Sequence, residues 1–149
     1  MTFKLTVEGF REGGVIPRRH TCEGEDVSPA LAWENTPAKT RSLALIVDDP
    51  DAPVGTWNHW LVWDLPAALT GLPEGAGGGV SGTNDFGRPG YGGPCPPRGH
   101  GAHRYYFKLY ALDVDTLGVP PNATRRDLDA ALAGHVLAEA RYMGRYERK

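Results

Sequence analysis

Short apolar runs separated by glycine and proline recur along most of the chain. Residues 42–47 form a nearly continuous apolar run, which predicts a strand that is buried on both faces. Residues 59–65 and 104–112 form two further runs, and the second is rich in aromatic side chains that favour a pleated sheet. Residues 1–7 alternate apolar and polar side chains and predict a first strand. The pattern favours a mainly β fold, a sandwich or a barrel, over a helical protein.

The hydrophobic period changes near the C-terminus. Thr124 can cap a helix, with Asp127 three residues later in an imperfect capping box. Apolar residues then recur at four-residue intervals: Leu128, Leu132, Val136 and Ala140. We therefore expect one amphipathic helix over about residues 125–143, docked on the sheet at the periphery of the molecule.

A long glycine-rich segment, residues 73–102, separates the second and third strong strands. Loops of this length inside a compact protein are usually functional or disordered. Asn84, Asp85, Phe86 and Tyr91 interrupt the glycines with side chains that can dock onto the rest of the protein. We expect this part of the segment to be ordered and the part over residues 75–82 to be more mobile.

Composition narrows the class of protein further. A length of 149 residues predicts a single domain over residues 1–149, and the net charge of −2 without a basic stripe argues against nucleic-acid binding. No run of eighteen apolar residues predicts a membrane span, and the N-terminus lacks the apolar core of a signal peptide. The chain is therefore expected to be cytoplasmic. Cys22 and Cys95 lie far apart, which in that compartment predicts free thiols and no zinc site.

Ionisable side chains lie at the ends of the predicted strands. Asp48 and Asp49 end the buried strand and should point to opposite faces, so that one of them faces inward. His59 and His103 each begin a strand, and Tyr105 follows the second histidine. If these strands are antiparallel, their ends can converge. The sequence then predicts a compact hydrogen-bonding pocket in which prolines form the walls.

Three chemistries could use such a pocket. Nucleophilic catalysis lacks support, because Ser81 is in no G-x-S-x-G motif and nothing pairs Cys95 with a base. A metal site lacks it too, because His100 and His103 lie in a glycine loop and not at ligand spacing on a helix. Anion binding fits best, since imidazole, tyrosine and glycine amide groups can donate to phosphoryl oxygens. Asp49 would then orient one imidazole, and no cofactor or metal is expected.

Several motifs are together very specific: Ser28-Pro29-Ala30-Leu31-Ala32-Trp33, Asp49-Pro50-Asp51-Ala52-Pro53, Trp57-Asn58-His59-Trp60, Asn84-Asp85-Phe86-Gly87, Gly90-Tyr91-Gly92-Gly93-Pro94-Cys95-Pro96-Pro97, Gly99-His100-Gly101-Ala102-His103-Arg104-Tyr105 and a helical Gly134-His135-Val136-Leu137-Ala138. On these residues the chain resembles the phosphatidylethanolamine-binding protein family, also called Raf-kinase-inhibitor-like proteins, and most of all its small bacterial branch. The resemblance runs from about Phe10 to Tyr146. It implies a β-sandwich of two antiparallel sheets with Greek-key connections and a peripheral C-terminal helix.

The resemblance also implies a surface pocket for phosphate, acetate or a phospholipid head group. The implied binding residues are Asp49, Asp51, Pro53, Trp57, His59, Gly93, Cys95, Pro96, Pro97, His103, Arg104 and Tyr105. Arg104 is expected to pair with a nearby aspartate instead of the ligand. The chain departs from animal relatives at Asn58, where these often carry histidine, and at Cys95, where glycine is common.

These observations predict a non-enzymatic binding protein for phosphate-type anions or phosphorylated head groups, used in regulation or ligand sensing. His59 and His103 would donate hydrogen bonds to the anion, with affinity rising as the pH falls through roughly 7 to 5.5. The alternative is a phospho- or ester hydrolase that uses His59 as its general base. A third possibility is an interaction module that grips another protein, such as a kinase, through residues 75–93. A homodimer through exposed aromatic residues is plausible, and among thirteen prolines at least one cis peptide bond is expected.

Overall fold

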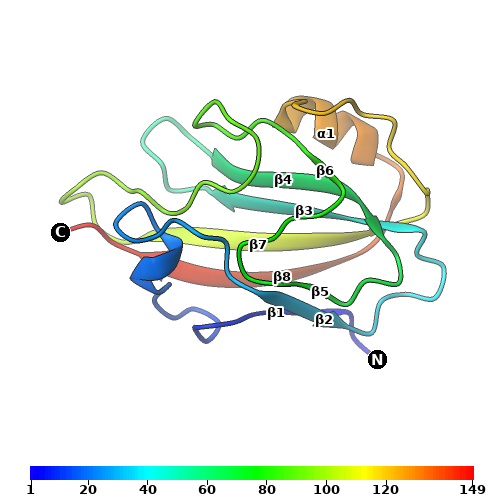
Figure 1. Ribbon diagram of the computed structural model, residues 1–149, viewed down its shortest axis with the longest axis horizontal. Helices are drawn as coiled ribbons and strands as arrows, with labels where there is room; N and C mark the ends of the chain where they lie inside the picture. Colours follow the sequence, from blue (N-terminus) through cyan, green and yellow to red (C-terminus); the bar gives the residue numbers. More distant parts are fainter.

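The computed structural model describes all residues 1–149 and consists mainly of two antiparallel β-sheets (Figure 1). The larger sheet has five strands in the order β6-β4-β3-β7-β8. Their bounds are β3 Ser42–Asp49, β4 Trp57–Pro66, β6 Val80–Ser81, β7 His103–Leu112 and β8 Val136–Tyr146. The strands that the apolar runs predicted are therefore confirmed as β3, β4 and β7, and β3 lies at the centre of the sheet.

The smaller sheet has three strands in the order β1-β2-β5. Its strands are β1 Lys4–Val7, β2 Leu31–Glu34 and β5 Gly71–Leu72, so the first predicted strand is confirmed. A short 3-10 helix, η1, covers Arg18–His20 between β1 and β2. In Figure 1 the small sheet lies below the large one, and the single α-helix lies above it.

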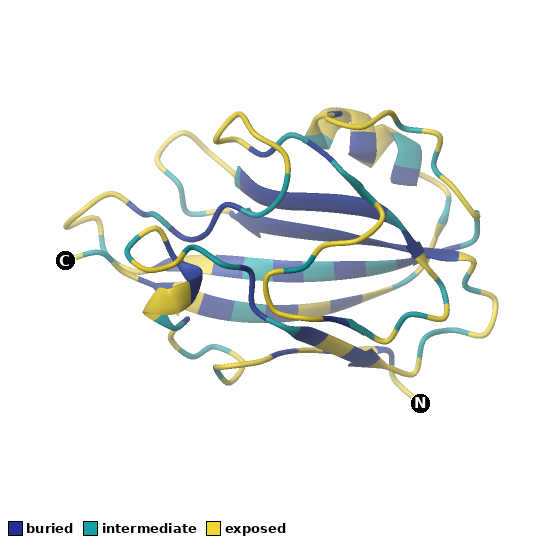
Figure 2. Ribbon diagram, viewed as in Figure 1, coloured by how far each residue is buried: buried dark blue, intermediate teal, exposed yellow.

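The central strand β3 is buried along its whole length because both faces of the large sheet are covered (Figure 2). Leu43, Leu45 and Val47 belong to a cluster of 17 buried residues that fills the space between the two sheets. Ala44 and Ile46 point the other way, into a cluster of eight that α1 covers. The period of two along a strand separates these faces, which explains why β3 reads as continuously apolar.

The C-terminal helix is shorter than its sequence pattern predicts. Helix α1 covers Arg125–Leu132 only, and its capping box, formed by Thr124 and Asp127, is complete. Gly134 then adopts a φ of 82°, a left-handed conformation that ends helices without strain for glycine. Residues 134–138 are consequently not helical, and the chain continues into β8 beside β7.

Strand β8 was not predicted, because apolar residues spaced four apart fit both the helical period and the strand period of two. Leu128 and Leu132 are buried by helical periodicity, whereas Ala140, Tyr142, Gly144 and Tyr146 are buried by strand alternation. Four is a multiple of two, so Ala140 satisfied both patterns. The alternation of buried residues over 140–146 was the signal that indicated a strand.

The glycine-rich segment, residues 73–102, carries no regular structure except β6. It is docked where its polar and aromatic residues were expected to dock. The Asp85 carboxylate accepts hydrogen bonds from the backbone and side-chain amides of Asn58, and the Tyr91 hydroxyl donates to the carbonyl of His20. Asn84 is buried, and its side-chain oxygen accepts from the amides of Phe86 and Arg88.

The expectation of a cis peptide bond is wrong, since every peptide bond in the protein is trans. Trans is the preferred isomer even before proline, and glycines with positive φ supply the tight turns instead. No helix of the protein combines the length and the apolar character that crossing a bilayer would require.

Candidate functional site

The antiparallel order of three strands brings the predicted polar residues to one edge of the large sheet. Strand β3 pairs antiparallel with both β4 and β7, so its C-terminal end meets the N-terminal ends of its two neighbours. Asp49 therefore lies beside the start of β4, which carries His59, and the start of β7, which carries His103 and Tyr105. The convergence predicted from the strand ends is what the structure shows.

A cavity of about 240 Å³ opens at this edge. Such a volume suits a small polar group together with part of an apolar group attached to it. It is below the range typical of pockets for drug-sized ligands. Nine of the residues predicted for the binding site line it: Asp49, Pro53, Trp57, His59, Cys95, Pro96, Pro97, His103 and Tyr105. Whether they bind an anion stays a prediction.

Asp49 fixes the orientation of His103. Oδ2 of Asp49 lies 2.7 Å from Nδ1 of His103, and both side chains are almost fully buried. Because an ionised carboxylate only accepts hydrogen bonds, Nδ1 of His103 must carry the proton. Oδ1 of Asp49 accepts from the backbone amide of Asp51, which closes the turn after β3. Asp49 thus both caps this turn and orients an imidazole.

Asp48 faces the opposite side of the sheet, as the strand period requires. Its Oδ2 is 2.9 Å from both Nζ of Lys108 and Nη1 of Arg125, and the carboxylate is buried. Arg125 also donates to the side-chain oxygen of Asn58. This charge network ties α1 to the sheet and leaves Asp49 as the carboxylate of the cavity.

His59 is held from the other side of the cavity. Its Nδ1 lies 2.7 Å from the carbonyl oxygen of Gly92, which can only accept, so Nδ1 is the protonated nitrogen. Burial lowers the pKa of His59 below its ordinary value, which favours the neutral ring at neutral pH. Nε2 of neutral His59 is then a hydrogen-bond acceptor, and it becomes a donor only when the ring takes up a proton.

The hydroxyl of Tyr105 is buried and has no hydrogen-bond partner in the protein. Its ring lies edge-on to His59, with centroids 5.2 Å apart. Burial raises the pKa of this phenol above its ordinary value, and the nearby Asp49 carboxylate acts in the same direction. The hydroxyl therefore keeps its proton. Buried polar groups are usually hydrogen-bonded, so this hydroxyl in the cavity wall is a donor that a ligand could engage.

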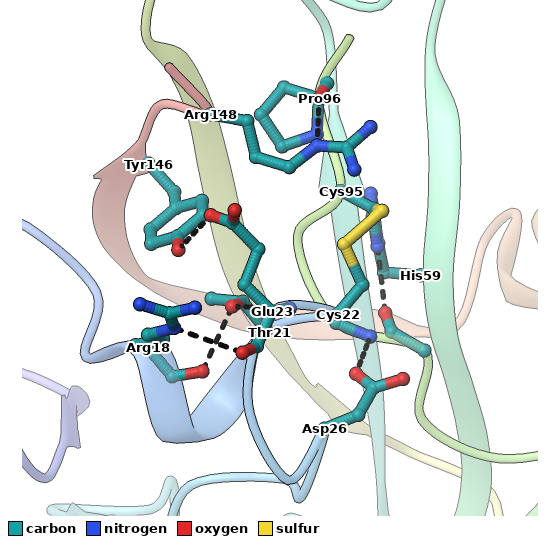
Figure 3. The surroundings of a disulfide bond; sticks show 12 residues. Arg18, Thr21, Cys22, Glu23, Asp26, His59, Cys95, Pro96, Tyr146 and Arg148 are labelled. Carbon is teal, nitrogen blue, oxygen red and sulfur yellow. Dashed lines mark hydrogen bonds between the residues drawn. A yellow bond between two sulfur atoms is a disulfide. The ribbon is translucent and has the colours of Figure 1, made fainter. Parts of the chain in front are cut away.

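Cys22 and Cys95 form a disulfide in the cavity wall, so the expectation of free thiols is wrong (Figure 3). The two residues are 73 apart in sequence, but the fold brings their Cα atoms to 5.4 Å. The backbone amide of Cys22 donates to the carbonyl of Pro94, which places the two segments side by side. Sequence separation gives no signal for such a pair, because only tertiary structure sets the distance.

Glycine at position 93 permits this close approach. A Cβ atom there would lie 2.2 Å from the carbonyl oxygen of His20 and 2.5 Å from Oδ1 of Asp26. The Gly93 amide donates to the same Asp26 oxygen at 2.8 Å. Gly93 does not line the cavity. It lets the wall that Cys95, Pro96 and Pro97 form pack closely against the segment of His20 and Asp26.

Asp51 and Arg104 also lie outside the cavity lining. Arg104 donates from Nε and Nη2 to the two carboxylate oxygens of Asp51, at 2.9 and 2.7 Å, as its expected pairing with an aspartate requires. These bonds lower the pKa of Asp51 to about 2. The pair fastens the turn after β3 to the start of β7, and so it holds the cavity edge without facing a ligand.

Sequence reasoning missed three residues of the lining: Ala52, Val54 and Phe86. All three lie in or beside motifs that were recognised, which is the signal that could have included them. Phe86 packs edge-on against Trp57 and His59, and both Phe86 and Val54 are exposed at the mouth. The cavity therefore has a polar floor and an apolar rim. No group of three or more histidine, cysteine or acidic side chains is arranged to hold a metal ion.

Comparison with known proteins agrees with this architecture. A UPF0098 protein of Aquifex aeolicus is 51% identical over 93% of this chain and 85% of its own length. A UPF0098 protein of Methanothermobacter thermautotrophicus is 48% identical over 97% of this chain and 98% of its own.

Solved structures show the same fold. A phosphatidylethanolamine-binding protein homologue from Chlamydia trachomatis superposes with a TM-score of 0.93 at 41% identity, covering 99% of each chain. YbcL of E. coli, described as a member of the mammalian family, superposes with a TM-score of 0.94 at 36% identity and full coverage of both chains. The sequence profile named "Phosphatidylethanolamine-binding protein" matches residues 6–147. This chain belongs to the phosphatidylethanolamine-binding protein family.

Proposed function

We propose that the protein binds a small phosphate-type anion, or the phosphorylated head group of a larger molecule, in the cavity between β3, β4 and β7. The observation that carries this proposal is the buried, unpartnered hydroxyl of Tyr105 beside two histidines. A phosphoryl oxygen would supply the acceptor that this hydroxyl lacks. Membership of the family supports a binding protein.

The charge of the cavity sets the conditions for binding. Asp49 contributes one negative charge, which an imidazolium of His103 would balance. Neutral His59 presents an acceptor at Nε2, so an anion must bring a proton there or meet a protonated His59. Both requirements are met more fully at lower pH. Affinity for a phosphate-type anion should therefore rise as the pH falls through roughly 7 to 5.5.

The apolar rim suggests how a larger ligand would lie. Val54, Phe86 and the side chain of Trp57 surround the mouth, whereas Asp49 and Tyr105 lie deeper. A phosphoryl group on the floor would leave an attached apolar or aromatic part against these side chains. Inorganic phosphate should consequently bind more weakly than a phosphomonoester that carries such a part.

Ring spectra of the histidines test the proposal directly. Inorganic phosphate and phosphoethanolamine are titrated by NMR at about pH 5.5 and about pH 7.5, where histidine changes charge. We expect shifts of the His59 and His103 rings that are larger at the lower pH. His135, exposed at the other end of β7 beside Asp113, is the internal control and should not respond. The absence of a shift at His59 and His103 would reject the proposal.

A hydrolase is the second candidate, because one observation favours it. A buried carboxylate on Nδ1 of a histidine, as Asp49 is on His103, is the arrangement that orients a catalytic base, and neutral His59 could also accept a proton. No serine or threonine lines the cavity and Cys95 is in the disulfide, so water would have to be the nucleophile. Turnover of a panel of carboxylic and phosphoric esters that is lost in His59→Ala and kept in His135→Ala would support it.

A further inference from the structure

Both ring nitrogens of His103 are engaged within the protein. Nδ1 donates to Asp49, and Nε2 lies 2.6 Å from Nδ1 of His100. Because Nδ1 of His103 carries the proton, Nε2 of the neutral ring is an acceptor, and Nδ1–H of His100 is its donor. His103 thus has no nitrogen free for a ligand, although its ring lines the cavity.

His100 lies where a side chain can move without disturbing the fold. It is exposed, unlike His103, and it follows a turn in which its amide donates to the carbonyl of Pro97. Gly99 and Gly101 flank it with φ of 73° and 90°, and neither would meet another atom within 4 Å if it carried a Cβ. Two glycines with room around them therefore flank the side chain that contacts Nε2 of His103.

We propose, on the basis of the anion-binding function above, that His100 is a latch that must leave Nε2 of His103 before the cavity's anion can bind to that nitrogen. The side chain competes with the ligand for the same hydrogen-bonding atom. Release of His100 leaves Nε2 of His103 free to meet a phosphoryl oxygen, while Nδ1 stays bonded to Asp49. A protonated His103 then donates from Nε2 while its charge balances the carboxylate.

Acid should open the latch. One proton added to the pair can be shared between the facing nitrogens and keeps them in contact. A second proton places hydrogens on both facing nitrogens and two positive charges side by side, so the contact must break. The ionisable groups around the pair come from three strands: Asp49 at the end of β3 and Asp51 just after it, Tyr105 on β7, and His59 on β4, whose ring packs against Tyr105.

Affinity of the intact protein for inorganic phosphate, measured by calorimetry at about pH 7.5 and about pH 5, tests the latch. His100→Ala removes the competitor and should bind phosphate about fivefold more tightly at the higher pH, as expected for the loss of one competing hydrogen bond. At the lower pH the two proteins should have similar affinities, because the latch of the wild type is open. The protonation of phosphate itself affects both proteins equally and cancels in the ratio.

Two further variants separate the latch from general effects. An asparagine places its amide near the position of a histidine Nδ1 but does not titrate. His100→Asn should therefore match the wild type at about pH 7.5 and bind more weakly than both other proteins at about pH 5. His135→Ala removes another exposed histidine, roughly 30 Å away along β7, and should match the wild type at both pH values. Each substitution is on the surface, so folding should be unaffected.

The outcomes distinguish the latch from the binding function. Phosphate binding by His100→Ala that is equal to or weaker than that of the wild type at the higher pH overturns the latch and leaves anion binding in place. No phosphate binding by either protein at either pH overturns anion binding and the latch together. Nitrogen NMR of the wild type gives a ligand-free check: the neutral His100 ring should carry its proton on Nδ1, and a proton on Nε2 contradicts the latch.

Discussion

Asp49 and His103 form a buried pair in which Oδ2 and Nδ1 are 2.7 Å apart and the side chains are only 4% and 2% exposed. The pair joins the last residue of β3 to the first residue of β7. A second aspartate–histidine pair, Asp113 with His135, has a similar distance of 2.9 Å, but its side chains are 43% and 44% exposed. The same aspartate–histidine contact therefore occurs twice in this protein, once buried and once exposed to solvent.

Replacing Asp49 by alanine should lower the free energy of unfolding by about 3 kcal/mol, because His103 and the amide of Asp51 lose a buried partner. Asp113→Ala is the matched control and should cost less than about 1 kcal/mol, since water replaces its carboxylate. Urea denaturation at neutral pH measures both. Similar losses in the two variants would show that the buried pair does not order the cavity.

Replacing Tyr105 by phenylalanine should separate binding from stability. The hydroxyl has no partner in the protein, so its removal should leave the free energy of unfolding unchanged or raise it. Affinity for phosphate should nevertheless fall about 10- to 100-fold, the value of one hydrogen bond to a charged group.

Tyr91→Phe is the control for stability, because this partly buried tyrosine donates from its hydroxyl to the carbonyl of His20. Its loss should destabilise the protein by about 1 kcal/mol. A Tyr105→Phe variant as unstable as Tyr91→Phe would mean that the Tyr105 hydroxyl already has a partner within the protein. The hydroxyl would then not be available to a ligand.

Strand positions and the convergence of Asp49, His59 and His103 could be predicted from the sequence because each signal is local. A strongly apolar run marks each strand, and a polar residue at its end lies at the sheet edge whatever the rest of the fold does. Resemblance to the family then identified most of the cavity lining. Its rim residues Val54 and Phe86 were missed because they are apolar and resemble ordinary core or surface positions.

Features that depend on tertiary distance could not be predicted in the same way. The partners Cys22 and Cys95 meet only because the segment after η1 packs against the residues before Pro96. The first part of β8 was taken for helix because Val136 and Ala140 continue the four-residue spacing of the helix, although Gly134 ends the helix before them. The contact of His100 with His103 depends on the path of a glycine turn, which no periodicity describes.

His59 should make the folded protein sensitive to acid. Burial lowers its pKa in the folded state below the ordinary value of about 6.5. A group with a lowered pKa contributes stability above its unfolded pKa and loses that contribution as the pH falls through the folded one. His59→Asn keeps a donor for the carbonyl of Gly92 but does not titrate. The unfolding free energy of this variant should therefore fall less steeply than that of the wild type below about pH 6.5.

The slopes of unfolding free energy against pH measure this difference. Other carboxylates and histidines titrate equally in both proteins, so they cancel in the comparison. Parallel curves for His59→Asn and the wild type would contradict a neutral, buried His59. Added phosphate should reduce the acid loss of the wild type, because an anion stabilises the protonated ring.

Reducing the disulfide should lower the stability of the protein, but the cavity should keep its structure. Closing a loop of this length is worth about 4 kcal/mol in the chain-entropy description. The wall has other attachments: the amide of Cys22 to Pro94, the amide of Gly93 to Asp26, and the hydroxyl of Tyr91 to His20. Urea denaturation with and without reductant should show the loss, while NMR spectra of the reduced protein keep the folded pattern around His59.

The double variant Cys22→Ser/Cys95→Ser is the control for effects of the reductant other than cleavage of the disulfide. It should match the reduced wild type in stability, and added reductant should change nothing further. Unfolding of the wild type by reductant alone would mean that the three hydrogen bonds do not hold the wall, and that the disulfide does.

Gly93→Ala should be the most damaging glycine substitution near the cavity. Its Cβ would approach the carbonyl oxygen of His20 to 2.2 Å, and this oxygen belongs to backbone that cannot rotate away. The wall must therefore move off the segment that carries Asp26, at a cost of about 2–3 kcal/mol. Gly77→Ala is the control, because a Cβ there meets nothing within 4 Å and its φ is not positive, so the change should be neutral or slightly stabilising. Since Pro96 and Pro97 follow directly, Gly93→Ala should also weaken phosphate binding, and undiminished binding would show that the wall does not shape the cavity.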